Sequence, residues 1–121
     1  LGLKWGEAGA ISGTFESSQQ TLTPAGLLTI ALGLGVEPVG VELVLYCAVA
    51  QGGYSVGDRV LVTNNSSNGG NMRSPSVTIN STNVVVRYAS GAPLWQLTNK
   101  STGGQLDITS SSWRLIVKAW G

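Results

Sequence analysis

The side chains that most often carry out catalysis are scarce in this chain. It has no histidine, one cysteine and six carboxylates. Histidine is the commonest general base and metal ligand, so one chain alone cannot build a Ser-His-Asp triad or a zinc hydrolase site. The carboxylates are scattered, and no two have a spacing that suggests glycosidase chemistry: Glu7, Glu16, Glu37, Glu42, Asp58 and Asp107. We therefore expect no enzyme, no metal site and no cofactor.

The residue types that remain are suited to non-covalent recognition. The chain has four tryptophans and three tyrosines. Their rings stack on sugars and anchor protein interfaces, while amide side chains and arginine hydrogen-bond to hydroxyl groups. Tyr54, in the segment GGYSVGDRVLV (52–62), is expected to face solvent at the opening of a strand. Trp95 follows a proline-containing turn and is expected to be the most exposed indole, with burial in the core as the alternative.

The segment NNSSNGGNMRSP (64–75) is the longest loop candidate. It has no aromatic or β-branched residue, and its glycines lower the cost of unusual backbone angles. Long loops on rigid scaffolds often carry recognition, although loops of this composition can also be plain connectors. The receptor contacts expected in this loop are Asn64, Asn65, Asn68, Asn71 and Arg73.

The elements that would position these residues are strands. Apolar residues alternate with a period of two in the runs 28–34, 39–50, 56–63, 84–88 and 113–120. Clusters of Gly, Asn, Ser and Pro separate these runs, and no segment shows a helical stripe. β-Branched residues dominate the runs, as is typical of strands. The sequence predicts an all-β domain, an antiparallel β-sandwich of two sheets.

Two of the predicted strands are apolar on both faces. The second face of the run 39–50 carries Tyr46, and that of the last strand carries Ile116 and Trp120. A half-buried sandwich strand normally has a polar outer face. We therefore expect Tyr46, Ile116 and Trp120 to meet another subunit in a trimer or other tightly packed, even intertwined, oligomer. The alternative is the ordinary scatter of exposed apolar side chains.

Composition limits the other partners. The chain has 121 residues, a net charge of +1, 42% hydrophobic and 11% charged residues. This length suits one compact domain, and so few charges favour association between identical copies. A net charge this small predicts no basic surface for binding nucleic acid. The longest apolar run is too short to span a membrane. No signal peptide is visible, and the start at Leu1 suggests a piece of a longer protein. Cys47 can form no intrachain disulfide and is expected to be a buried hydrophobe.

Three segments together resemble a known family. They are LTIALGLGVEPVGVELVLYCAVAQGGYSVGDRVLV (28–62), STNVVVRYAS (81–90) and SSWRLIVKAWG (111–121). They are similar to the C-terminal tip domain of tailed-bacteriophage tail fibres, and LKWG (3–6) is similar to the lead-in before such tips. One departure is Leu32, where related fibres often have a histidine, so a histidine-dependent metal or receptor role is not carried over.

The resemblance implies a fold, an assembly and a place of action. Such tips are small β-sandwiches, some similar to H-type lectins, carried on homotrimeric fibres that contact the host cell surface. It implies a lead-in from the fibre shaft at 1–20 and a sandwich tip at 21–121. The chain would be made in the host cytoplasm and displayed on the virion.

Three functions are compatible with these expectations. The first is a tip that binds a host cell-surface glycan or protein non-covalently through Tyr54, Trp95 and the loop at 64–75. The second is a structural trimerisation or capping module without receptor contact. The third is a free secreted lectin.

Overall fold

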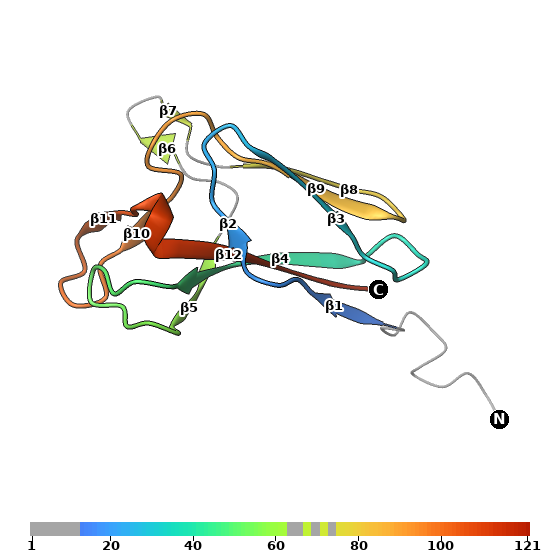
Figure 1. Ribbon diagram of the computed structural model, residues 1–121, viewed down its shortest axis with the longest axis horizontal. Helices are drawn as coiled ribbons and strands as arrows, with labels where there is room; N and C mark the ends of the chain where they lie inside the picture. The colour runs from blue at the N-terminus through green and yellow to red at the C-terminus, as the bar shows by residue number, and fades with distance from the viewer. Residues whose placement is uncertain (1–12, 63–66, 69–70, 73–74) are drawn as a thin grey trace.

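The computed structural model describes residues 13–62, 67–68, 71–72 and 75–121. The described residues form an all-β fold, with 48% of them in strands and 3% in helix, and every strand pair among them is antiparallel. The predicted all-β, antiparallel fold is confirmed, and Figure 1 shows two layers of strands facing each other, as in a β-sandwich. None of the helical structure in the described ranges has the length and apolar character of a membrane span.

The larger sheet is built on two long central strands. Its strands run in the order β1-β12-β4-β5, and β2 also pairs with β12. The bounds are β1 Thr14–Glu16, β2 Gln20–Thr21, β4 Gly40–Cys47, β5 Arg59–Val62 and β12 Trp113–Trp120. Because Leu45 pairs with Leu115 and Leu43 with Val117, the alternating leucines and valines of β4 and β12 face the same side. β1 and Gln20, which precede residue 21, also pair within this sheet.

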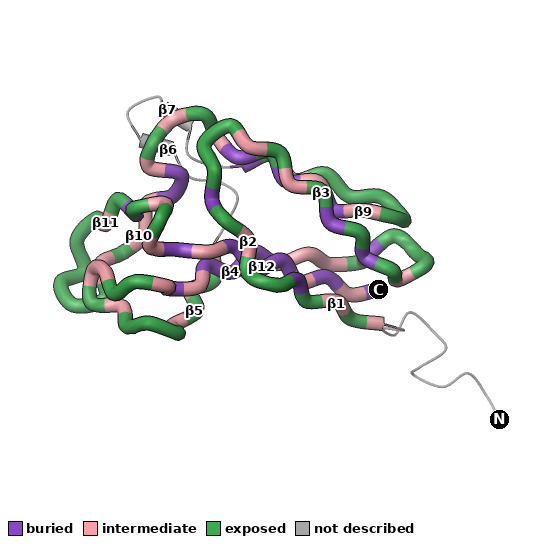
Figure 2. The backbone as a smooth tube through the Cα atoms, in the orientation of Figure 1, coloured by how far each residue is buried: buried purple, intermediate pink, exposed green. Residues whose placement is uncertain are grey.

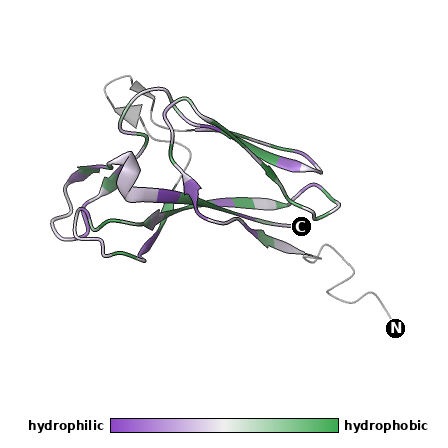
Figure 3. Cartoon of the chain, viewed as in Figure 1, coloured by the Kyte–Doolittle hydropathy of each residue, from purple (hydrophilic) through white to green (hydrophobic). Residues whose placement is uncertain are grey.

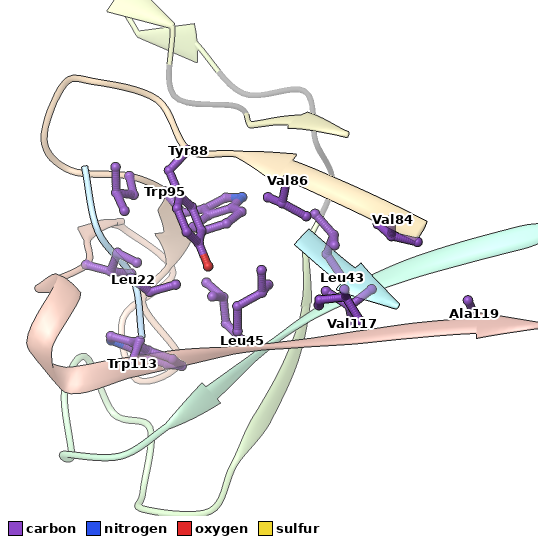
Figure 4. Close-up of a cluster of buried hydrophobic side chains, with 14 of the residues drawn as sticks. Leu22, Leu43, Leu45, Val84, Val86, Tyr88, Trp95, Trp113, Val117 and Ala119 are labelled. Carbon is purple, nitrogen blue, oxygen red and sulfur yellow. The ribbon is translucent and has the colours of Figure 1, made fainter. Parts of the chain in front are cut away.

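The smaller sheet covers the inward face of the larger one. It has the order β3-β9-β8, with β3 at Leu27–Ala31, β8 at Ser76–Ile79 and β9 at Asn83–Arg87. Val84 and Val86 of β9 are fully buried and join the leucines of β4 and β12 in one core. Figure 4 shows this core between the layers, with Trp95 and Trp113 at one end. Hydrophobic residues occur along the strands of both sheets (Figure 3). The strands β3 and β9 include exposed residues, whereas β4 and β12 have none, and Figure 2 shows this difference in burial.

Short elements complete the chain at opposite ends of the sandwich. The hairpin of β10 (Gln96–Thr98) and β11 (Gln105–Asp107) is followed by a single 3-10 turn, η2, at Ser110–Ser112. β6 (Ser67–Asn68) pairs with β7 (Asn71–Met72). At the other end, Gly13 and Gly121 exchange two backbone hydrogen bonds of 2.8 and 3.1 Å. Figure 1 shows that Gly13 and Gly121, the first and last described residues, lie at the end of the sandwich away from the β10–β11 hairpin.

Two strands are shorter than the sequence pattern predicts. β4 ends at Cys47 because the amides of Ala48 and Val49 turn to the carbonyl of Ser112. β5 starts only at Arg59 because Gly57 and Asp58 both oppose Cys47: the Gly57 amide donates to the Cys47 carbonyl, and the Cys47 amide donates to the Asp58 carbonyl. Two residues against one is a β-bulge, and Gly57 has the positive φ, 96°, that such bulges use.

Candidate functional site

The segment Gln51–Asp58, which contains the predicted contact Tyr54, is a docking element for the β10–β11 hairpin. The Tyr54 hydroxyl donates to the Thr98 carbonyl at 2.7 Å. The Tyr54 ring meets Trp113 edge-on, with centroids 5.4 Å apart, and Lys100 Nζ lies 5.9 Å from its centroid. Both the ring and the hydroxyl of Tyr54 thus bind within the protein, and the residue is half-buried. This arrangement gives Tyr54 a structural role in holding the hairpin, and its expected receptor contact stays a prediction.

The two glycines before Tyr54 allow this close approach. Gly52 and Gly53 have φ values of 59° and 82°. A Cβ on Gly52 would overlap the Leu106 side chain, and a Cβ on Gly53 would overlap Ser101. The Lys100 amide then donates to the Gly52 carbonyl at 2.9 Å. Glycine is needed here both for its backbone angle and for the absence of a side chain.

Asp58 closes the same turn. Its Oδ2 accepts hydrogen bonds from the Ser55 amide at 2.9 Å and from Lys100 Nζ at 3.2 Å. The Ser55 amide first, and then Lys100, hold the pKa of Asp58 below its ordinary value. Asp58 therefore ties the turn to the hairpin.

Gln51 holds the other side of this junction. Its Oε1 accepts from the Trp113 indole at 2.8 Å and from the Thr109 amide at 3.1 Å, while its Nε2 donates to Thr109 Oγ1 at 2.9 Å. A half-buried carboxamide with three such bonds fixes Trp113 and the chain after β11 in one arrangement. Gln51 was not among the predicted site residues.

Trp95 does not lie on the surface. The expectation of an exposed indole is wrong: Trp95 is 1% exposed and packs edge-on against Tyr88, with ring centroids 6.3 Å apart. Figure 4 shows both rings inside the core. Leu94 beside it is buried too, so this stretch has no alternation from which its orientation could be predicted. Trp95 is part of the core and cannot stack on a receptor.

The predicted contacts in the loop at 64–75 lie mostly beyond what the structure describes. Asn64, Asn65 and Arg73 are outside the described residues. Asn68 and Asn71 pair as the inner residues of the β6–β7 hairpin, but their side chains are also outside the described part. These five residues stay predictions.

The three predicted interface residues share the outer face of the larger sheet. Tyr46 and Trp120 are half-buried there, while Ile116 is 2% exposed beside Val44 at 1%. Neither Ile116 nor Val44 belongs to the core cluster of buried residues between the sheets. Their burial within one chain means that a neighbouring subunit is not needed to cover Ile116.

Long charged side chains cover this apolar pair. Arg59 Nη1 lies 3.5 Å from Glu16 Oε2, and Lys118 Nζ lies 3.7 Å from Glu16 Oε1. Arg59 is on β5 and Glu16 on β1, the two edges of the sheet, so their ion pair passes over β12 and β4. Exposed ion pairs of this kind contribute little energy, but their aliphatic stems bury apolar surface. The outer face is thus closed at its centre, while Leu61 beside it is 70% exposed.

Trp120 lies between two hollows at the end of this sheet. Its indole covers Gly40, the residue that it faces on β4, and a Cβ on Gly40 would overlap the ring. A cleft of about 430 Å³ is lined by Val41, Glu42, Leu43, Val62, Val77, Ile79 and Trp120. A second hollow of about 290 Å³ is lined by Thr14, Phe15, Glu16, Lys118, Ala119 and Trp120. Trp120 therefore lines both hollows at this end of the sheet.

The outer face of the β10–β11 hairpin carries a second ordered group of polar side chains that the sequence analysis missed. Gln96 pairs with Asp107, and Thr98 with Gln105, so these four residues point to the same side. Gln96 Nε2 and Gln105 Nε2 both donate to Asp107 Oδ1, at 2.9 and 2.8 Å. Leu97 and Leu106 point to the other side and pack against the core. The alternation QLT…QLD could have revealed this face.

The described residues contain no group of three or more His, Cys, Asp or Glu side chains that could hold a metal ion. Cys47 is buried, and burial raises the pKa of its thiol. Comparison of the chain with protein-family models, curated proteins and solved structures returns no match.

Proposed function

We propose that this chain is a receptor-binding tip of the tail-fibre type, which contacts a host cell-surface glycan or protein without covalent chemistry. The sequence resemblance supports this proposal. The observation that carries it is the polar β10–β11 hairpin at the end of the sandwich opposite Gly13 and Gly121 (Figure 1). A module attached near Gly13 would present this hairpin outward.

The proposed tip works as a homotrimer on the virion, where several weak sites act together through avidity. Each copy contributes one rigid hairpin. The junction with Gln51–Asp58 fixes the hairpin before binding, which lowers the entropic cost of contact.

The test attaches a bulky group to one end of the molecule at a time. Thr102→Cys places a thiol at the exposed tip of the hairpin, and Ser81→Cys places one on the exposed turn between β8 and β9 at the other end. Each thiol is coupled to a large maleimide polymer, while Cys47 is buried and stays unreacted. Binding of labelled protein to a panel of bacterial strains is then measured.

The proposal expects binding to some strains, loss of binding with the polymer at Thr102→Cys, and retention with the polymer at Ser81→Cys. Binding to no strain contradicts a receptor tip. Equal binding with both polymers contradicts the choice of the hairpin end.

The second candidate function is a trimerisation or capping module. It is favoured by the apolar surface at and near the chain ends, where Val39 is 75% exposed and Trp120 borders two hollows. Such a module would form the homotrimer and bind no cells.

A further inference from the structure

We infer that the outer face of the β10–β11 hairpin binds the neighbouring hydroxyl groups of an uncharged sugar. This inference rests on the proposed receptor function and names the ligand class of its site. The face consists of Gln96, Thr98, Gln105 and Asp107, hereafter the hairpin face.

The hairpin face is rigid before any ligand arrives. On its reverse side, Leu97 and Leu106 pack against the core. At its tip, Asn99 Oδ1 accepts from the amides of Ser101 and Thr102, at 2.9 and 3.1 Å. The docking bonds from Tyr54 and to Gly52 hold its flank. Because these contacts already hold the hairpin, ligand binding costs little additional conformational entropy of the protein.

Hydrogen bonds within the hairpin face orient its polar groups, and some of its donors and acceptors remain free to bind a ligand. Asp107 Oδ1 accepts both carboxamide donors, so Gln96 and Gln105 are held on either side of one carboxylate. Among the described residues, Asp107 Oδ2 has no hydrogen-bond partner, and Lys100 is bonded to Asp58 instead. Each carboxamide keeps a second N–H and its carbonyl oxygen. The face thus offers donors and acceptors side by side.

Sugar hydroxyls match this pattern because each one both donates and accepts a hydrogen bond. Two neighbouring hydroxyls can donate to Asp107 Oδ2 and to a carboxamide oxygen while they accept the remaining amide hydrogens. Anionic ligands fit less well. A phosphate, sulfate or sialic acid would meet the Asp107 carboxylate, and the described residues give Asp107 no ion pair. A neutral glycan therefore fits this face better than an anionic one.

The experiment titrates the purified chain with methyl glycosides of glucose, galactose and mannose, and separately with sialic acid and glucose 6-phosphate. Binding is followed by saturation-transfer NMR and by the side-chain amide signals of Gln96 and Gln105. We expect a site of four polar side chains to bind a single methyl glycoside with a Kd in the millimolar range. Asp107→Asn and Gln96→Ala should each weaken binding about tenfold, as expected for loss of one bond to a charged group.

Gln20→Ala is the matched control because it removes a half-buried glutamine from β2, on the larger sheet, away from the hairpin face. It should leave the affinity unchanged. The inference is overturned if no neutral glycoside binds, if an anionic probe binds more tightly, or if Asp107→Asn binds as the unaltered chain does. Cell binding that survives Asp107→Asn and Gln96→Ala leaves the receptor function standing and rejects this site. If the unaltered chain binds no cells, both the receptor function and the sugar site on the hairpin face are rejected.

Discussion

At the residue scale, two tyrosines that each pack edge-on against a tryptophan differ in burial and in the hydrogen bond of the hydroxyl. The Tyr54 hydroxyl donates to the Thr98 carbonyl, whereas the buried Tyr88 hydroxyl has no partner among the described residues. A buried hydroxyl that finds no partner keeps its desolvation cost. Tyr88→Phe should raise the free energy of unfolding by about 1 kcal/mol, and Tyr54→Phe should lower it by about 1 kcal/mol. Urea unfolding measures both, and a loss of stability in Tyr88→Phe would reject the assignment.

The buried hydroxyl of Tyr88 should also make the stability of the fold depend on pH in the alkaline range. Burial raises the pKa of Tyr88 from 10.0 to about 12. The folded state therefore holds this proton more tightly than the unfolded state, so the stabilisation is complete below pH 10.0 and is lost as the pH rises to about 12. Stability measured at pH 9 and pH 11 should fall in the unaltered chain and fall less in Tyr88→Phe. Equal slopes would mean that Tyr88 ionises equally well in both states.

Asp58 titrates in the opposite direction. Its pKa lies below 3.8 in the folded chain, so the bonds to Ser55 and Lys100 are present above pH 3.8 and are lost as the pH falls through the lowered value. The Ser55 amide signal should shift with a midpoint below 3.8. Lys100→Met should move this midpoint upward only in part, because the Ser55 amide is the larger cause. A midpoint of 3.8 or higher in the unaltered chain would contradict the closed turn.

At the element scale, the docking of Gln51–Asp58 on the β10–β11 hairpin depends on space as well as on backbone angle. Gly53 and Gly103 both have positive φ, 82° and 78°, but a Cβ meets Ser101 at Gly53 and open space at Gly103. Gly103→Ala should cost about 1 kcal/mol of unfolding free energy, from backbone strain alone. Gly53→Ala adds an overlap, which brings the loss to about 2–4 kcal/mol. Similar losses in thermal or urea unfolding would show that the hairpin is not packed there.

These elements also show what sequence alone could predict. Alternation identified β4 and β12 and put Leu45, Trp113 and Leu115 on the core side, because a half-buried strand must alternate. It could not place Tyr54, since the position of that ring depends on a hairpin more than forty residues away, at Thr98. It also could not show that Arg59 and Glu16 reach across two strands of the apolar outer face. That this face meets another subunit stays a prediction. Local pattern predicts strands, whereas contacts between loops and across a sheet need the fold.

At the scale of the whole molecule, the expected homotrimer must use surface that one chain leaves open. The outer face of the larger sheet is closed over Ile116, but Leu61 at its edge is 70% exposed. Leu27, on the outer face of the smaller sheet, is 57% exposed and gives a matched control. If the larger sheet forms the interface, Leu61→Glu buries a charge between subunits and should convert the oligomer to monomers, whereas Leu27→Glu should leave it intact.

Sedimentation of the three proteins at equal concentration decides this, with circular dichroism to confirm that each variant is folded. Dissociation by Leu61→Glu alone supports an interface on the larger sheet, centred on its β5 edge rather than on Ile116. Dissociation by Leu27→Glu alone moves the interface to the smaller sheet. A monomeric unaltered chain contradicts the homotrimer itself, and avidity could then no longer support the millimolar sites proposed for the hairpin.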